Sequence, residues 1–260
     1  MTDFYPHVYL SPHLDDAVLS CGGLIHQQVV AGQRPLVITL FAGSPPTDGE
    51  LSAFVQSSHA RWGGSANVVA ARRAEDRAAL AELDADYLWL HYPDCIYRGR
   101  GHGGEWYYTS SEFLFGPMHP ADAGLPAELA SALTELIPPG NDVTLYSPLT
   151  VGNHVDHRLT HTAALILSGQ GWRVRFYEDY PYVEKEGALA AALAARGIDR
   201  WQPAVIPLTE DDLAAKIRAI ACYQSQLEGL FGGEEAMPER IRSYVAQVGG
   251  ERIGALQPGV

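Results

Sequence analysis

The sequence predicts an α/β domain built around a mostly parallel β-sheet. Short runs rich in Val, Ile, Leu and aromatic residues alternate with longer segments that carry apolar residues at helical spacing. This alternation is typical of parallel strands joined by right-handed crossovers. A length of 260 residues and a hydrophobic content of 47% suit one large globular domain. No internal repeat or linker divides the chain, so we expect a single domain over residues 1–260.

The strands are predicted from short apolar or β-branched runs that end at turn residues. Residues 35–41 form a nearly continuous apolar run, as in a strand that is covered on both faces. Pro93 ends another such run, because proline lacks the N–H that a sheet requires. We expect strands at 7–10, 35–41, 87–92, 142–146, 172–177 and 204–207.

The helices are predicted from apolar residues that recur at spacings of three and four. The segment 16–30 has this spacing, and Gly32 follows it as a typical C-terminal stop. Residues 42–67 and 250–260 show neither pattern, and no element is predicted there. We expect helices at 16–30, 72–83, 127–137, 154–167, 188–196, 213–226 and 239–248.

The stretch at about 95–126 is predicted to be a loop insertion. It combines closely spaced glycines with Trp106, Tyr107, Tyr108, Phe113 and Phe115. Long segments without periodicity inside a compact domain are usually functional or disordered, and the aromatic density favours function. Because aromatic faces stack on flat ligands, we expect this insertion to overhang a pocket; ordinary packing is the alternative.

The composition argues against several classes of partner. Lys and Arg number 18 against 31 Asp and Glu, which gives a net charge of -13. Nucleic acids and anionic lipids bind basic surfaces, so we expect neither nucleic-acid nor membrane partners. The chain shows no secretory signal, no membrane-length apolar run and no disulfide framework. We therefore expect a cytoplasmic protein, for which a homo-oligomer is compatible with the sequence.

Two clusters of histidine and aspartate follow two of the predicted strands. The first lies in Ser-Pro-His-Leu-Asp-Asp at 11–16, and the second lies in Asn-His-Val-Asp-His at 153–157. Because ligands bind beyond the carboxyl ends of parallel strands, we expect both clusters at one edge of the sheet. In chain order, their members are His13, Asp15, Asp16, His154, Asp156 and His157.

These residue types together indicate a metal site. If Asn153 caps the next helix, with Asp156 completing a capping box, His154 and His157 share one face of its first turn. Two histidines and a carboxylate, with a position open to water, form a recurring catalytic zinc site. Taken singly, each carboxylate could be a helix cap and each histidine an ordinary surface residue. The coincidence of two clusters favours the metal.

The same residues resemble the two signature motifs of the LmbE-like, or PIG-L-like, zinc-dependent N-deacetylases of the GlcNAc-PI de-N-acetylase type. The first motif of that family is usually His-Pro-Asp-Asp, and here Leu14 stands at the proline position; Val155 likewise replaces a common proline. Weaker similarity extends to Arg-Arg-Ala-Glu at 72–75, Tyr-Pro-Asp at 92–94 and Tyr-Gln-Ser-Gln at 223–226. The resemblance implies a Rossmann-like, three-layer α/β fold.

The resemblance also implies a role for each motif residue. Asp15 would be the general base that activates water. His154 would stabilise the oxyanion, with protonation of the leaving amine as a second role, and Asp156 would orient His154. The implied cofactor is Zn2+, although Fe2+, Co2+ or Mn2+ also suit such ligands. The implied metal ligands are His13, Asp16 and His157.

Arg72 and Asp94 are the implied substrate contacts, since the matching residues of the family reach hydroxyl groups of a sugar. Arg72 could instead pair with Glu75 or Asp76 on an exposed helix face. Asp94 could instead be an ordinary turn residue after a proline. The sequence leaves both alternatives open.

The main hypothesis is therefore a zinc-dependent N-deacetylase. Its partner would be a small-molecule amide, an acetamido sugar or a sugar-bearing conjugate, which it would convert to acetate and a free amine. One alternative is an amidase of the same family that acts on a larger thiol conjugate or natural product. The other is a catalytically silent binding protein, and the intact set of motif residues speaks against it.

Overall fold

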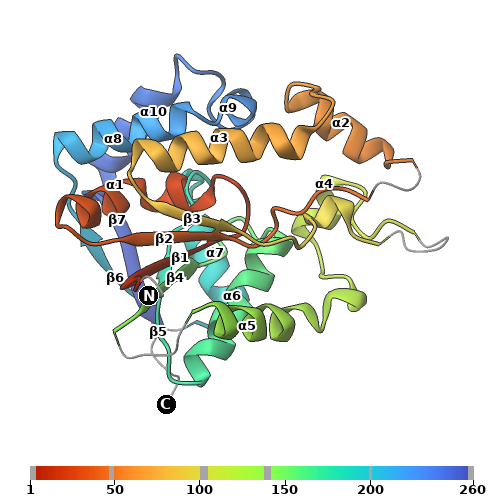
Figure 1. Cartoon of the computed structure of the whole chain (residues 1–260), viewed down its shortest axis with the longest axis horizontal. Coiled ribbons are helices and arrows are strands. Elements are labelled where there is room, and N and C mark those ends of the chain that lie inside the picture. Colours follow the sequence, from red (N-terminus) through yellow and green to blue (C-terminus); the bar gives the residue numbers. More distant parts are fainter. Residues whose placement is uncertain (1–3, 47–49, 100–104, 138–141, 199–200, 257–260) are drawn as a thin grey trace.

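The computed structural model describes residues 4–46, 50–99, 105–137, 142–198 and 201–256, and it confirms the predicted α/β architecture. Among these residues, the strands form one seven-stranded sheet in the order β3-β2-β1-β4-β5-β7-β6 (Figure 1). The strands are β1 His7–Ser11, β2 Pro35–Thr39, β3 Asp86–Trp89, β4 Thr144–Pro148, β5 Arg173–Tyr177, β6 Trp201–Ile206 and β7 Glu251–Leu256.

The strand order of the sheet changes direction between β1 and β4. β1 pairs in parallel with β2 on one side and with β4 on the other, and β7 is antiparallel to both of its neighbours. The chain builds β1, β2 and β3 toward one edge and then returns to place β4 and β5 beyond β1. Such a reversal opens a crevice beyond the carboxyl ends of the two central strands, where α/β proteins bind ligands.

Helices cover both faces of the sheet. α1, α3 and α8 pack together on one face, while α5 and α6 pack on the other (Figure 1). The helices are α1 Asp16–Val30, α2 Ala53–Arg61, α3 Val68–Glu82, α4 Ser111–Phe115, α5 Leu125–Leu136, α6 Val155–Gly169, α7 Ala188–Ala195, α8 Glu210–Ala221, α9 Gln224–Phe231 and α10 Met237–Val248. Short 3-10 turns occur at η1 Cys95–Tyr97, η2 Pro120–Asp122 and η3 Tyr182–Glu184.

A buried ion pair joins β7 to the α1–α8 layer. Lys216 Nζ lies 2.7 Å from Glu251 Oε1, and both side chains are almost completely buried. The Glu251 carboxylate also accepts hydrogen bonds from the backbone N–H groups of Gly23 and Leu24. α8 approaches closely here, because a Cβ at Gly22 would lie 3.2 Å from Lys216 Cγ. The glycine therefore makes room for the lysine.

Three segments differ from the predicted elements. α2 lies within 42–67, where a loop is predicted, and the expected helix at 213–226 is two helices, α8 and α9. β7 occupies the tail for which no element is predicted. The apolar pattern of β7 is too weak to predict a strand. The strand forms because it pairs with β5 and β6.

The insertion at about 95–126 is anchored by buried polar contacts. Tyr108 donates a hydrogen bond to Asp122 Oδ2 at 2.7 Å, and Arg98 Nε lies 3.0 Å from the same oxygen. The described part of the insertion contains η1, α4 and η2, although the sequence predicts only a loop. Residues 100–104, with three of its glycines, lie outside the described residues.

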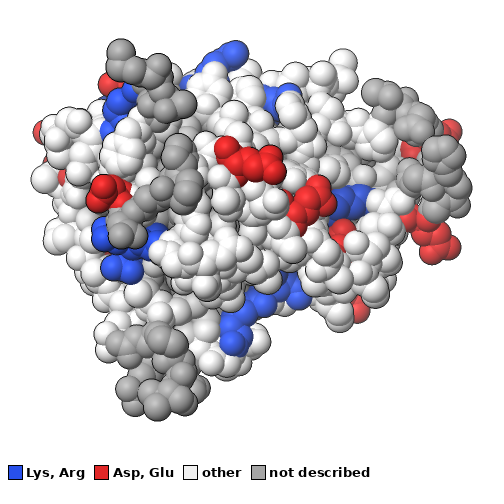
Figure 2. Space-filling model, turned by 60° about the horizontal axis from the view of Figure 1, so that its bottom comes forward, with Lys and Arg blue, Asp and Glu red and all other residues white. Residues whose placement is uncertain are grey.

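The charged side chains form small groups on the face that Figure 2 shows. On the face shown in Figure 2, acidic and basic residues are interspersed and separated by uncharged surface. Within the described ranges, every helix is too short or too polar to cross a bilayer.

Replacement of Lys216 by Met is expected to lower the free energy of unfolding by about 3–5 kcal/mol, because it leaves the Glu251 carboxylate buried without its cation. Urea denaturation followed by circular dichroism measures the effect. The control is Arg242→Met, which breaks the exposed Arg242–Glu210 pair and should cost less than about 1 kcal/mol. Equal losses in the two variants would contradict a structural role for the buried pair.

Candidate metal and catalytic site

The loop after β1 presents its histidine and aspartates through a tight turn. Ser11 Oγ donates to the carbonyl of His13 and accepts from the N–H of Ala17, which ties the strand end to the start of α1. The backbone N–H of His13 donates to Asp16 Oδ2 at 2.8 Å. Asp15 occupies the N-cap position of α1, but its side chain makes no capping hydrogen bond. Its carboxylate is therefore free to face the crevice.

The loop after β4 differs from the predicted cap. The N-cap of α6 is His154, whose Nδ1 accepts a hydrogen bond from the backbone N–H of Asp156 at 3.3 Å. Asn153 has a left-handed backbone (φ 67°), and its side chain contacts Phe115 and Arg196 instead. Since Nδ1 of His154 accepts, the neutral ring carries its proton on Nε2. That nitrogen lies 3.9 Å from Cys95 Sγ.

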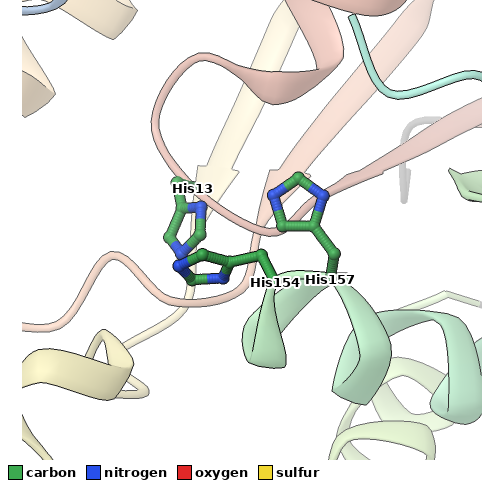
Figure 3. A group of neighbouring side chains, drawn as sticks. All are labelled: His13, His154 and His157. Atoms are coloured by element: carbon green, nitrogen blue, oxygen red, sulfur yellow. The ribbon is translucent and has the colours of Figure 1, made fainter. Parts of the chain in front are cut away.

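The two loops bring three imidazole rings together. Figure 3 shows His13 from the first loop facing His154 and His157 from the start of α6. The ring centroid of His13 lies 4.8 Å from that of His154 and 5.4 Å from that of His157. Each ring places a nitrogen within 4.8 Å of the others, a separation that suits a shared metal ion.

Asp16 lies between two of these rings. Its Oδ2 is 3.1 Å from His13 Nδ1, and its Oδ1 is 3.3 Å from His157 Nε2. Among the described residues, the buried Nε2 of His157 has no hydrogen-bond partner. Ligand atoms about 2.1 Å from a tetrahedral ion are roughly 3.4 Å apart. The donor types, their spacing and the unsatisfied nitrogen all fit a divalent metal ion.

The electrostatics of the site favour positive charge. Burial alone would lower the pKa of His157, but the Asp16 and Asp179 carboxylates raise it to about 9. The pKa of His13 is likewise raised well above its usual value, because hydrogen bonds to Asp156 and Asp16 outweigh burial. The His157 and His13 rings in turn hold the pKa of Asp16 well below its usual range despite its burial. A cation would replace these protons.

Asp15 and His154 are buried beside this donor set. Burial and the neighbouring Asp16 raise the pKa of Asp15 to about 6, against the opposing charge of Arg72. Burial lowers the pKa of His154 well below its usual value, and the charge of His13 lowers it further. A carboxylate that titrates near neutrality suits proton transfer. A neutral imidazole with its proton on Nε2 suits hydrogen-bond donation.

The carboxylate of Asp156 makes its hydrogen bonds to groups other than His154, the residue that the resemblance implies it orients. Its Oδ2 lies 3.1 Å from His13 Nε2 and accepts from the backbone N–H of Cys95 at 2.9 Å. Its Oδ1 lies 2.6 Å from Arg98 Nη1. The hydrogen bond between Asp156 and His154 comes from the backbone N–H of Asp156, although a carboxylate oxygen of Asp156 lies within 4.8 Å of a His154 ring nitrogen. As the N-cap, His154 directs Nδ1 to the helix backbone, and the Asp156 carboxylate reaches His13 in the loop after β1.

A cavity of about 250 Å3 opens above these residues, and the two expected substrate contacts line it. Arg72 is buried, with Nη2 3.3 Å from Asp15 Oδ2 and its guanidinium 4.8 Å from the centre of the Trp62 ring. The alternative of an exposed, self-paired Arg72 is therefore wrong. Asp94 caps η1 by accepting from Ile96, as a turn residue would, and its Oδ2 also lies 3.9 Å from His13 Nε2.

Asp179 and Arg98 also contact the motif residues, although neither is predicted from the sequence. Asp179 Oδ1 lies 2.6 Å from His157 Nδ1, which leaves Nε2 of that ring free for a metal. A signal for Asp179 was present, because it follows the end of β5 at the same sheet edge as the two motifs. Arg98 carries no such signal, since it lies within the insertion and reaches Asp156 only through the fold.

Comparison with known proteins gives consistent matches. The profile of the family described as PIG-L: GlcNAc-PI de-N-acetylase matches residues 8–168. A 2'-N-acetylparomamine deacetylase of Streptomyces fradiae is 31% identical over 243 residues, which cover 90% of this chain and 76% of that protein. The corresponding deacetylase of Niallia circulans is 28% identical over 238 residues, which cover 87% and 82%. The crystal structure of a zinc-inhibited form of teicoplanin deacetylase has a TM-score of 0.79 and 26% identity, covering 98% of this chain and 99% of that one.

Replacement of Asp179 by Asn is expected to weaken metal binding about 10–100-fold, because it removes the carboxylate that orients His157. Competition with a chromophoric chelator measures the affinity. Asp76→Asn is the matched control: Asp76 is equally buried, but it bonds Trp89 and Tyr223 rather than a candidate ligand. If both variants bound metal as tightly as the wild type, Asp179 would have no part in the site.

Proposed function

The chain belongs to the PIG-L family of N-deacetylases, and we propose that it hydrolyses the acetamido group of an amino sugar carried on a larger conjugate. The observation that carries this proposal is the meeting of both motifs at the floor of one cavity, with Asp15, Asp16 and His154 lining it together. Relatives that deacetylate N-acetylparomamine and teicoplanin support the substrate class.

We assign zinc to His13, Asp16 and His157, one donor from each residue. The distances around Asp16, and the Nε2 of His157 that lies near Asp16 without making a hydrogen bond, support this set. When bound, zinc lowers the pKa of a water molecule from 15.7 to about 7 and polarises an amide carbonyl. Asp156 and Asp179 hold the two ligand imidazoles in place by contacting their other nitrogens.

Asp15 acts as the general base. Its carboxylate is buried next to the metal ligand Asp16 and held by Arg72, so it accepts the proton of the attacking water. The same carboxyl group then carries the proton that the leaving amine requires. Asp15 rather than His154 is therefore the proton donor to the amine, because the neutral His154 ring has one N–H and the oxyanion accepts from it.

His154 stabilises the developing oxyanion through that N–H. Its Nδ1 is occupied by the α6 backbone, so Nε2–H is the only donor that the ring can direct elsewhere. Burial excludes water and makes such a hydrogen bond more valuable than in solution. Arg72 and Asp94 line the cavity beside these groups, where they bind sugar hydroxyl groups.

The experiment that tests this function is acetate release. The purified, zinc-loaded protein is incubated with acetamido sugar conjugates, and acetate is quantified enzymatically together with the free amine. Equimolar acetate and amine would support the proposal. Release of a longer acid or of a thiol-bearing amine from other N-acyl conjugates, with none from acetamido sugars, would replace it by the related amidase.

Replacement of Asp15 by Asn is expected to lower kcat by ~10²–10⁴-fold while zinc remains bound, because the amide cannot accept the proton. The variant keeps the shape of the side chain next to Arg72. Acetate release and zinc content are measured on the same preparation. Full turnover would remove Asp15 from the mechanism.

His157→Ala is expected to abolish zinc binding, whereas His154→Ala should retain about one zinc per chain and lose turnover. His154 is the N-cap of α6 and His157 lies in its first turn, so each variant controls for the other. Elemental analysis measures the metal and also identifies Fe2+, Co2+ or Mn2+ if one of these is loaded. Zinc loss in His154→Ala alone would mean that the two histidines have exchanged roles.

A further inference from the structure

The outer part of the cavity differs in chemistry from its floor. Beyond the motif residues, the walls come from α2, α4, α9 and the turn before η3. Most of the side chains there are apolar or aromatic. The larger ones are Phe54, Trp62, Leu114, Phe115, Tyr182 and Leu230.

The aromatic rings of this wall continue from the catalytic histidines outward. Tyr182 packs edge-on against His157, with centroids 5.8 Å apart, and Phe115 packs edge-on against His154 at 5.5 Å. Phe115 lines the cavity and is itself 38% exposed. A group attached to a sugar at the floor would therefore meet aromatic surface first.

The charged residues of the cavity also distinguish its outer part from its floor. Among the described residues, the carboxylates that line it are Asp15, Asp16 and Asp94, and all three belong to the floor. The outer walls contribute one charged side chain, Arg61. The Trp62 ring already bears the Arg72 guanidinium at 4.8 Å. An ammonium group in the outer cavity would find no carboxylate there and would be repelled by both arginines.

We propose that the outer cavity is an aglycone subsite that takes an apolar, aromatic group linked to the acetamido sugar. The inference rests on the proposed function and narrows its substrate class. Stacking against Phe54 and Phe115 would hold the conjugate while the acetamido group reaches the floor. The subsite selects against conjugates that carry amines next to the sugar.

The test compares three glycosides of N-acetylglucosamine that differ only in the attached group: phenyl, methyl and 2-aminoethyl. Acetate release gives kcat/KM for each. We expect the phenyl glycoside to exceed the methyl glycoside by roughly tenfold or more, and the 2-aminoethyl glycoside to be the poorest. In Phe54→Ala and Phe115→Leu, the phenyl-to-methyl ratio should fall toward one. Leu at position 115 keeps an apolar contact with His154.

Phe113→Ala is the matched control. Phe113 lies on α4 next to these residues and is 50% exposed, but it does not line the cavity. It should keep the wild-type ratio, and thermal unfolding checks that all three variants are folded. Equal kcat/KM for the three glycosides, or a preference for 2-aminoethyl, would overturn the aglycone subsite and leave the deacetylase intact. Acetate release from none of them would overturn the acetamido-sugar function itself.

Discussion

The active-site floor depends on the parallel pairing of β1 with β4. In this register Tyr9 lies opposite Tyr146, so the two strands end side by side and release their loops at the same edge of the sheet. Residues more than a hundred positions apart in the chain thereby share one crevice. A slip of one residue would turn each side chain to the other face of the sheet and separate the motifs. The buried strands on both sides make such a slip costly.

Burying so many carboxylates requires that each has a specific partner. Asp156 faces Arg98 and His13, Asp179 faces His157, and Asp15 faces Arg72. An unpaired buried charge costs several kcal/mol, so these contacts restrict the site to few arrangements. The charge that this arrangement favours is positive and lies between His13, Asp16 and His157. The buried carboxylates therefore have two effects: they favour a cation between these residues, and Asp156 and Asp179 position the two histidines.

The motif residues and the walls of the outer cavity come from different parts of the chain. The floor is built by loops that follow two central strands, whereas the walls come from α2, α4 and α9, which lie outside the strand-to-helix units of the core. In Figure 1, α2 and α4 extend beyond one end of the sheet. These helices also reach the core and the floor: Val55 of α2 and Phe231 of α9 are buried in the hydrophobic core, and Phe115 of α4 packs against His154.

The sequence by itself predicted the fold class, the motif positions and a metal site of histidine and aspartate. Strands such as β2 and helices such as α1 are encoded by local spacing, and His13, Asp16 and His157 follow strand ends that the pattern marks. Only the tertiary structure decided the hydrogen-bond partners. The Asp156 carboxylate hydrogen-bonds to His13 rather than to His154, and Arg98 and Asp179 contact the motif residues from distant segments. β7 likewise forms because it pairs with β5 on one side and β6 on the other. Spacing along the chain specifies local geometry, but contacts between segments depend on how the whole core packs.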